Sequence, residues 1–238
     1  MFERWSTAHI SAPQRADFWR EAVCEAFVSM TPRIERLVDS RAILVHRGFD
    51  RLAFNTLEAA PHGVARTPID LAHGGRQYLF VNLNLSGRCR LRQFGRELIA
   101  QPGELLLIDS SEPYELEQAD EVDLLSLAVP HAMLGNLLPA ATEQVARRLP
   151  ASASAMLLAN QLRTLAQWPH ELNAAEAGWV SDLLVGMVRA LIAATAAAPG
   201  AHGGRCLQRK IQSLLEQQYP DAALAPGVVA QQAGVSRN

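Results

Sequence analysis

The residues of this chain that could do chemistry are few, and their spacing limits what that chemistry can be. No two of the seven histidines stand at the spacing of metal ligands. They are His9, His46, His62, His73, His131, His170 and His202. Cys24, Cys89 and Cys206 are widely separated, which is typical of reduced thiols in a cytosolic protein. The sequence therefore predicts no metal site and no cofactor.

Catalytic signatures are also missing from the sequence. The Gly-x-Ser-x-Gly motif of many hydrolases does not occur, and Cys89 has no histidine near it along the chain. The paired glycines Gly74-Gly75 and Gly203-Gly204 are better interpreted as a turn and a linker than as phosphate-binding loops. We therefore predict no catalytic residues, and a domain without them is more typical of a receptor than of an enzyme.

Binding residues can nevertheless be proposed from side-chain type and alternation. Arg66 is the candidate for an anionic ligand, because a guanidinium can clamp a carboxylate with two parallel hydrogen bonds. Three polar residues on one strand face and two aromatic residues complete the predicted effector site: Tyr78, Asn82, Asn84, Tyr114 and Trp19. Alternation alone does not say which face of a strand lies inside, so the face that lines the cavity stays open.

Residues 43–129 must position most of these side chains, and their pattern is that of short strands. Residues 43–60 predict two strands joined near Phe49-Asp50-Arg51, and Tyr78 to Leu85 is the clearest strand of the chain. Ser86-Gly87 turns this strand into the next one, where arginines alternate with apolar residues. Many short strands with turn signals about every ten residues indicate an antiparallel sandwich or barrel.

Helices are expected both before and after the strands in the sequence. Ser11 and Gln14 form a capping-box-like start for a helix that runs to about Ser29 and carries Trp19. After the last strand, the pattern predicts helices over residues 131–138, 153–167 and 172–198. Asp182 and Arg189 interrupt the apolar run of the last helix, which we therefore interpret as a packed helix and not as a membrane span.

The last helix carries an apolar seam with heptad spacing. Its members are Ala177, Val180, Leu184, Met187, Leu191, Ala194 and Ala198. One side of the helix can pack on the strands while the other pairs with a second copy, which predicts a homodimer. The predicted interface residues are Val180, Leu184, Met187 and Leu191. A helix packed wholly within one domain is the alternative that this pattern leaves open.

Composition and charge bound the class of protein. The 238 residues, 49% hydrophobic and 19% charged, are typical of a soluble globular protein with a sizeable core. The N-terminal Met-Phe-Glu-Arg-Trp lacks a signal segment, so we expect a cytoplasmic protein without a membrane partner. The net charge of −2 gives the chain no basic footprint for nucleic acid. Residues 205–238 differ, because four basic and two acidic side chains leave them at +2.

Several short motifs, taken in order, resemble a known family. They are Phe18-Trp-Arg-Glu21, Arg66-Thr-Pro68, YLFVNLNLSG at 78–87, FGRELIAQPGELLLID at 94–109 and Pro113-Tyr114. Together they resemble the cupin-like effector domain of AraC/XylS-type transcription regulators, in the subgroup that often answers to aromatic or other small organic acids. The resemblance implies an α+β fold, in which a cupin-like antiparallel β-barrel with an N-terminal helix precedes a helical dimerisation region and an all-α helix-turn-helix domain.

The C-terminal stretch resembles the first half of the DNA-binding domain of the same family. Leu224 to Asn238 reads as one helix, a turn at Gly234 and the start of a second helix capped by Ser236. The stretch departs from the family in lacking a capping box around Pro226. The predicted DNA-binding residues are Ser236, Arg237 and Asn238. Three residues cannot form a recognition helix, so we expect these 238 residues to bind effector and dimerise without binding operator DNA.

These observations lead to one expected organisation and one expected function. We expect an effector-binding and dimerisation domain over 1–196, a linker over 197–204 and an incomplete helix-turn-helix domain over 205–238. The expected function is an AraC/XylS-type transcription regulator that responds to a small organic acid and binds promoter DNA in a complete chain. A cupin-fold metalloenzyme, either an isomerase or a dioxygenase, is the main alternative. A module that titrates full-length regulators through mixed dimers is a third.

Overall fold

The computed structural model describes residues 2–33, 41–168 and 170–197. The predicted linker from residue 198 onward and the helix-turn-helix segment 205–238, including Ser236, Arg237 and Asn238, lie outside the described residues. Residues 1–193 form one compact unit, which holds every element discussed below except the last residues of the final helix.

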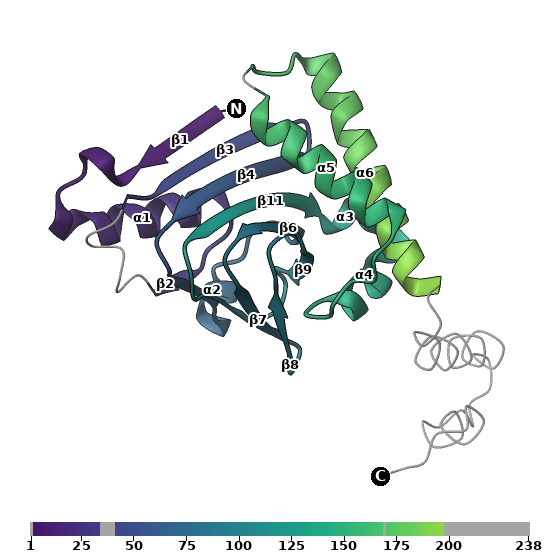
Figure 1. Cartoon of the computed structure of the whole chain (residues 1–238), viewed down its shortest axis with the longest axis horizontal. Helices are drawn as coiled ribbons and strands as arrows, with labels where there is room; N and C mark the ends of the chain where they lie inside the picture. Colours follow the sequence, from purple (N-terminus) through teal and green to yellow (C-terminus); the bar gives the residue numbers. More distant parts are fainter. Residues whose placement is uncertain (1, 34–40, 169, 198–238) are drawn as a thin grey trace, which may run out of the picture. The chain divides into compact units, whose positions relative to one another are not determined.

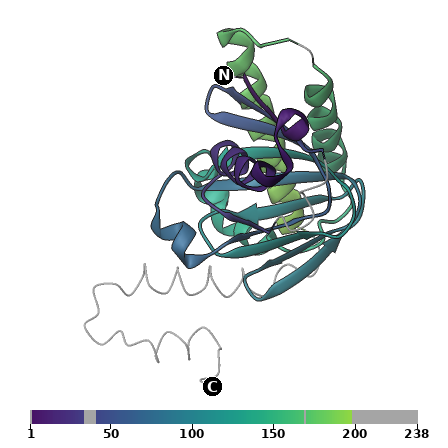
Figure 2. The ribbon, with the colours of Figure 1, turned by 90° about the vertical axis from the view of Figure 1, so that its left-hand side faces the viewer.

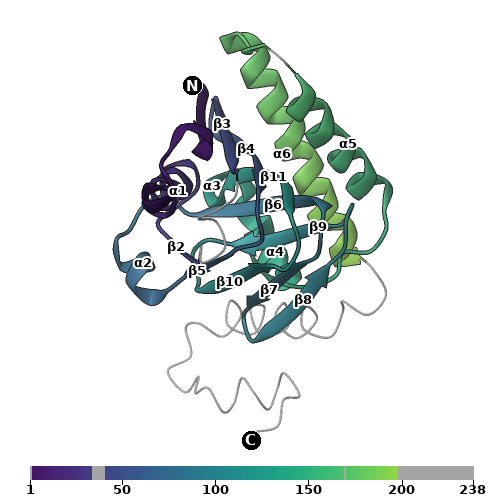
Figure 3. The same ribbon diagram turned by 60° about the vertical axis from the view of Figure 1, so that its left-hand side comes forward.

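The described residues contain eleven strands in two antiparallel sheets. The six-stranded sheet has the order β1-β3-β4-β11-β6-β9, and the five-stranded sheet has the order β2-β5-β10-β7-β8. The strands are β1 (Phe2–Ser6), β2 (Thr31–Arg33), β3 (Ile43–Phe49), β4 (Leu52–Ala59), β5 (Gly63–Arg66), β6 (Tyr78–Ser86), β7 (Cys89–Gln93), β8 (Arg96–Ala100), β9 (Leu105–Asp109), β10 (Tyr114–Gln118) and β11 (Val122–Pro130). The two sheets face each other across a narrow lumen (Figures 1 and 3), which confirms the predicted cupin-like, antiparallel architecture.

Strand β6 shows how alternation builds both faces of the six-stranded sheet. Phe80 and Asn82 point into the lumen, while Leu79, Val81 and Leu83 point to the opposite face. All five are buried, because the lumen covers one face and helices cover the other. The turn after β6 requires glycine at position 87, where φ is 66° and an added Cβ would lie 2.7 Å from the Glu121 carbonyl oxygen.

The helical layer covers the outer face of the six-stranded sheet (Figures 1 and 3). Two long antiparallel helices, α5 (Ala153–Gln167) and α6 (Ala174–Ala197), lie across the strands. The segment predicted as one helix over 131–138 divides at Gly135 into α3 (His131–Leu134), the 3-10 turn η2 (Gly135–Leu137) and α4 (Leu138–Gln144). The Ser181 hydroxyl donates to the Phe49 carbonyl oxygen at 3.2 Å and fixes α6 to the β3–β4 turn.

The N-terminal helix α1 (Ala12–Ala26) covers the inner face of the six-stranded sheet instead, as Figure 2 shows from the side. Trp19, Val23 and Ala26 pack against apolar residues of β3, β4 and β11 in a second buried cluster. The expected cap at Ser11 does not form, because its hydroxyl bonds the Gln14 side chain at 2.7 Å. The short element η1 (Thr7–His9) leads from β1 to α1, and α2 (Pro68–Ala72) connects β5 to β6.

The predicted dimer seam on α6 lies inside the protein. Leu184 and Leu191 are 1% and 0% exposed, and Val180 and Met187 are half-buried against the same core. In this conformation Leu184 and Leu191 therefore present no surface to a second copy, and that part of the prediction is corrected. The reason is that the six-stranded sheet needs an apolar cover, and a heptad pattern does not say which partner supplies it. Trp179 and Leu183 are the exposed apolar residues of this helix, at 73% and 50%.

Helix α6 is also long and apolar enough to cross a membrane by length and composition alone. Its mean hydropathy over the apolar window is 1.5. Core helices of soluble proteins pass the same test, and here Ser181, Val188 and Ile192 are buried inside the protein.

Candidate functional site

A small cavity lies in the lumen between the two sheets and α1. Its volume is about 40 Å³. Most of its wall is apolar, and three of its residues, Val23, Phe27 and Met30, come from α1 and the segment after it. The polar residues of the wall are His62, Asn82, Tyr114 and Gln118. A cavity of this volume has room for a few water molecules, so a larger ligand must widen it.

Cross-strand pairs between β5 and β10 run along one side of the lumen. Arg66 faces Tyr114 and Val64 faces Leu116 in the antiparallel register. The backbone N–H of Gln118 donates to the His62 carbonyl oxygen at 2.9 Å and continues the ladder. Because alternate residues share a face, this side of the lumen is polar at both ends and apolar in the middle.

Arg66 lies at one end of this row and is only 4% exposed. Its Nε donates to the Ser110 carbonyl oxygen at 2.8 Å, and its Nη1 donates to the Ser29 carbonyl oxygen. A guanidinium carries five N–H donors, so these two bonds leave donors for a ligand. Burial raises the pKa of the Tyr114 hydroxyl well above its usual range, and the nearby Arg66 opposes part of that rise. Tyr114 is therefore a neutral donor beside a buried cation.

The opposite end of the row holds His62 and Gln118. Burial lowers the pKa of His62, although the contact between its Nδ1 and the Ala60 carbonyl oxygen at 2.9 Å works against that shift. The imidazole is therefore uncharged at neutral pH. Gln118 is 5% exposed, and neither atom of its side-chain amide has a hydrogen-bond partner among the described residues.

A surface groove lies on the outer face of the five-stranded sheet, behind this end of the cavity. The groove has a volume of about 460 Å³ and shares His62, Val64, Leu116 and Gln118 with the cavity wall. Its rim carries Arg33, Arg88, Arg90 and Arg92. All four form ion pairs with acidic side chains, such as Arg33 with Glu115 at 3.1 Å. The rim is thus polar but balanced in charge, and β5 and β10 lie between this groove and the lumen.

The structure brings together two of the six predicted effector residues, Asn82 and Tyr114, in the cavity wall. Arg66 stands opposite Tyr114 but is not part of that wall. The other three lie elsewhere. Tyr78 stacks on Phe80 with ring centroids 6.0 Å apart, Asn84 donates to the Gly87 carbonyl oxygen at 2.6 Å, and Trp19 is fully buried under α1.

Two wall residues, His62 and Gln118, were missed by sequence reasoning. Gln118 carries a usable signal, because Tyr114, Leu116 and Gln118 alternate with glutamates and must share a face. His62 precedes its strand and carries no pattern.

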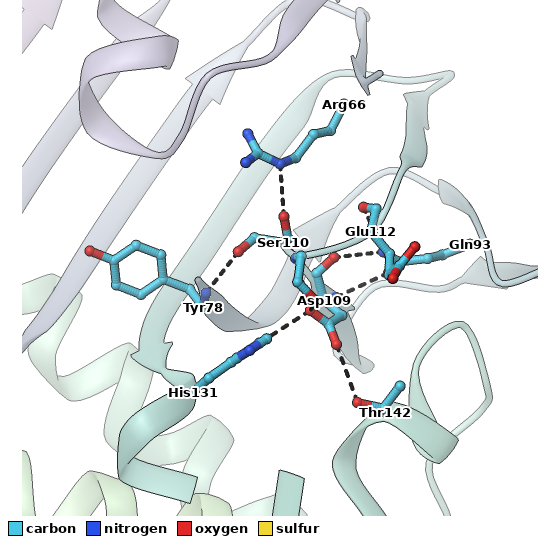
Figure 4. Close-up of polar contacts among 9 residues, drawn as sticks. Arg66, Tyr78, Gln93, Asp109, Ser110, Glu112, His131 and Thr142 are labelled. Atoms are coloured by element: carbon cyan, nitrogen blue, oxygen red, sulfur yellow. Dashed lines mark hydrogen bonds and ion pairs between the residues drawn. The ribbon is translucent and has the colours of Figure 1, made fainter. Parts of the chain in front are cut away.

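A buried carboxylate connects the rim of the barrel to the helical layer (Figure 4). Asp109, 3% exposed at the end of β9, accepts from the Ser111 hydroxyl at 2.6 Å and the Thr142 hydroxyl at 3.2 Å. Its Oδ1 also lies 3.1 Å from Nε2 of His131, the first residue of α3. Burial alone would raise the pKa of Asp109, but the hydrogen bonds from His131 and Ser111 outweigh it and lower the pKa.

The same cluster reaches Arg66. Ser110 follows Asp109, and its carbonyl oxygen accepts from Arg66 while its hydroxyl accepts from the Tyr78 backbone N–H at 2.7 Å (Figure 4). A continuous set of hydrogen bonds therefore links one end of the lumen to α3 and α4.

Residues 2–33, 41–168 and 170–197 contain no group of three or more His, Cys, Asp or Glu side chains that could hold a metal ion. In that part of the chain, Asp109 and His131 are occupied with each other and with hydroxyl groups.

Comparisons with known proteins agree with this geometry. The model of the AraC-binding-like domain matches residues 19–195. An uncharacterized protein in the nit 5' region of Bacillus sp. (strain OxB-1) is 26% identical over 136 residues, which cover 54% of this chain and 50% of that protein. The chain thus spans about half the length of this relative. The crystal structure of the AraC-like transcriptional activator CuxR superposes with a TM-score of 0.71 at 19% identity, over 99% of this chain and 85% of that one, and shows the same fold.

Proposed function

Because this chain belongs to the family of the AraC-binding-like domain, we propose that it is the effector-binding and dimerisation part of a transcription regulator. The observation that supports this most is the lumen cavity, whose wall is apolar except for a few buried polar side chains. Such a wall is typical of a site for a small organic ligand. The regulator would work by population shift, with the effector favouring one arrangement of the dimer.

The effector we propose is a small organic acid, aromatic or aliphatic. Its carboxylate would bind the Arg66 guanidinium and the Tyr114 hydroxyl, whose residues are cross-strand partners on β5 and β10. Its apolar body would lie among Phe27, Phe80 and Ile108. Binding would widen the cavity by moving α1, because α1 contributes part of the wall and is not a member of either sheet.

A saturating organic acid is expected to raise the melting temperature of the chain. A ligand at about one hundred times its Kd adds about 2.7 kcal/mol of stability, which corresponds to about 5–10 °C for a domain of this size. Arg66→Gln should lower the melting temperature without ligand, since Arg66 braces Ser29 and Ser110, and should abolish the shift. Differential scanning fluorimetry with a panel of aromatic and aliphatic acids measures both effects.

Arg33→Gln is the matched control for this experiment. Arg33 is exposed on the neighbouring strand β2 and pairs with Glu115 at the surface, so its variant should keep the full ligand shift. A shift of equal size in Arg66→Gln and the parent chain would contradict the carboxylate clamp.

The metalloenzyme alternative predicts a different result for the purified protein. A stoichiometric transition metal together with turnover would overturn the regulator proposal, and metal analysis by plasma mass spectrometry measures this. We propose no catalytic role for Asp109 or His131, because their polar atoms contact each other and neighbouring hydroxyl groups within the fold.

We propose a homodimer formed by the exposed face of α6. Trp179 and Leu183 stand one turn apart on that face, and the exposed Gly186 and Ala190 continue it. Small residues at this spacing allow a second helix to approach closely. Leu183→Asp is expected to convert the dimer to a monomer with an unchanged fold, because a carboxylate would be desolvated in the interface. Light scattering at micromolar concentration measures the mass, and an unchanged dimer would contradict this face.

The signal between lumen and dimer would pass through the Asp109 cluster. Arg66 contacts Ser110, and Asp109 contacts His131 of α3 and Thr142 of α4, which lead along the chain into α5 and α6. A ligand that draws the Arg66 guanidinium toward the lumen would therefore pull on the residue next to Asp109. This coupling is a proposal about mechanism and follows from contiguous hydrogen bonds.

DNA binding, the domain boundary and the cellular location stay predictions. The boundary at 197–204 and the partial helix-turn-helix at 205–238 rest on the sequence pattern and on the resemblance. We propose promoter DNA as the partner of a chain that contains both helix-turn-helix units, and a cytoplasmic location.

A further inference from the structure

The lumen is bordered by buried polar atoms that no neighbouring residue satisfies. Gln118 and Asn82 line the cavity and are 5% and 3% exposed. Ser126 of β11 is fully buried and stands opposite Asn82 in the register. Among the described residues, Gln118 Oε1, Gln118 Nε2, Asn82 Oδ1 and Ser126 Oγ have no hydrogen-bond partner. We refer to these three side chains as the lumen amide cluster.

Such a cluster is unusual inside a folded protein. Buried polar atoms are almost always paired, because a polar atom that loses its contact with water and gains no partner destabilises the fold. A neighbouring asparagine follows that rule. Asn55, in the same cross-strand row, donates to the Ala26 carbonyl oxygen at 3.1 Å and bonds His46 through its own carbonyl oxygen at 2.7 Å. Three unpaired atoms in the wall of one cavity, with the Ser126 hydroxyl beside them, therefore mark a site built for a polar ligand group.

The chemistry of the lumen amide cluster selects the kind of group. Gln118 Oε1 and Asn82 Oδ1 are carbonyl oxygens, which can only accept hydrogen bonds. A carboxylate has no proton to donate and would leave both oxygens without a partner. A hydroxyl can donate to one of these oxygens and an amide NH2 to both, and each can also accept from Gln118 Nε2 or the Ser126 hydroxyl. His62 at the same end is uncharged and adds no attraction for an anion.

We propose that the effector carries a neutral hydroxyl or amide group that binds Gln118 and Asn82, at the end of the cavity opposite to Arg66. This inference rests on the proposed binding of an organic acid in the lumen. It adds a second functional group to the effector and gives the orientation of the effector in the cavity. Gln118 lies four positions after Tyr114 on β10, which is about 13 Å of extended strand. Once the cavity has widened to admit one ring between these ends, the two polar groups should stand at opposite ends of the effector.

Three matched aromatic acids test this proposal on the 238-residue chain. They are 4-hydroxybenzoate, 4-methylbenzoate, in which a methyl group replaces the hydroxyl at nearly the same size, and 2-hydroxybenzoate, in which the hydroxyl adjoins the carboxylate. We expect 4-hydroxybenzoate to bind at least about tenfold more tightly than either of the others, since a site built to bond a hydroxyl discriminates against analogues that lack it or misplace it. Isothermal titration calorimetry gives the three Kd values.

Gln118→Met assigns the discrimination to the lumen amide cluster. This substitution keeps the length of the side chain and removes both unpaired amide atoms. It should erase the preference for 4-hydroxybenzoate over 4-methylbenzoate and raise the melting temperature without ligand by a few degrees. Glu117→Met is the matched control, because Glu117 precedes Gln118 on β10 and points outward. The control variant should keep the preference for 4-hydroxybenzoate, and its melting temperature without ligand should not rise.

The outcomes separate this inference from the proposed function. Equal Kd values for 4-hydroxybenzoate and 4-methylbenzoate, unchanged in Gln118→Met, would overturn the inference and leave acid binding intact. Tighter binding of 2-hydroxybenzoate than of 4-hydroxybenzoate would overturn the orientation. If none of the three acids binds, the proposed acid site in the lumen falls, and the inference falls with it.

Discussion

Leu184→Asp is expected to abolish folding of this chain. Leu184 is 1% exposed on α6 and belongs to the core that α6 shares with the six-stranded sheet. Removing a buried leucine side chain costs about 2–5 kcal/mol, and placing an unpaired carboxylate in the same apolar space adds several kcal/mol more. The total approaches or exceeds the 5–15 kcal/mol that typically separates a native domain from its unfolded chain, so the expected product is insoluble or unfolded protein.

Leu183→Asp is the matched control, one position earlier on the same helix. Leu183 is 50% exposed, so the same new charge meets water in the isolated subunit and the fold should persist. Circular dichroism and urea denaturation distinguish the two variants. A folded, monomeric Leu184→Asp protein would show that Leu184 faces a partner subunit and not its own sheet, and would restore the interface expected from the heptad pattern.

The helix prediction shows what sequence periodicity can and cannot establish. The spacing of apolar residues predicted α6 to within a few residues of Ala174–Ala197. It also identified the correct buried stripe, since Leu184 and Leu191 are both fully or nearly fully buried. An apolar stripe on a helix shows only that some apolar surface covers it, and not which one. The partner is decided by where the chain turns after β11, and that turn brings α5 and α6 over the sheet of the same subunit.

The site was predicted in part for a similar reason. Alternation grouped Asn82 with Tyr78 and Asn84 on one face of β6 without saying which face lies inside, and the motif around Pro113 pointed to Tyr114. It could not foresee that Gln118 and His62 would close the other end, because the register between β5 and β10 depends on pairing across the barrel and not on neighbours in sequence. Asn84 is not part of the site. The bulge in β11 lies beside it, and its side-chain amide donates to the Gly87 carbonyl oxygen in the turn after β6.

Asp109→Asn is expected to lower the free energy of unfolding by about 2–3 kcal/mol at pH 7, because hydrogen bonds to a charged acceptor are each worth about 1.5–3 kcal/mol. The substitution keeps the size of the side chain but replaces a carboxylate that accepts from His131, Ser111 and Thr142. One of its atoms becomes a donor and meets another donor in a buried space. Urea denaturation at pH 7 measures the loss, with Asp120→Asn as a control, since Asp120 forms an exposed ion pair with Arg88.

The pH dependence of the stability lost in Asp109→Asn is a sharper test of the role of the charge. The pKa of Asp109 is lowered in the fold, so its carboxylate stabilises the protein above its unfolded pKa, near 3.9, and that contribution disappears as the pH falls through the folded pKa. The parent chain should therefore lose stability between about pH 5 and pH 3 faster than Asp109→Asn, which has no proton to bind at this position. The difference in unfolding free energy between the two proteins should shrink as the pH falls. A difference that stays constant from pH 7 to pH 3 would mean that Asp109 acts through packing alone, and the charged link between the barrel and α3 would have to be abandoned.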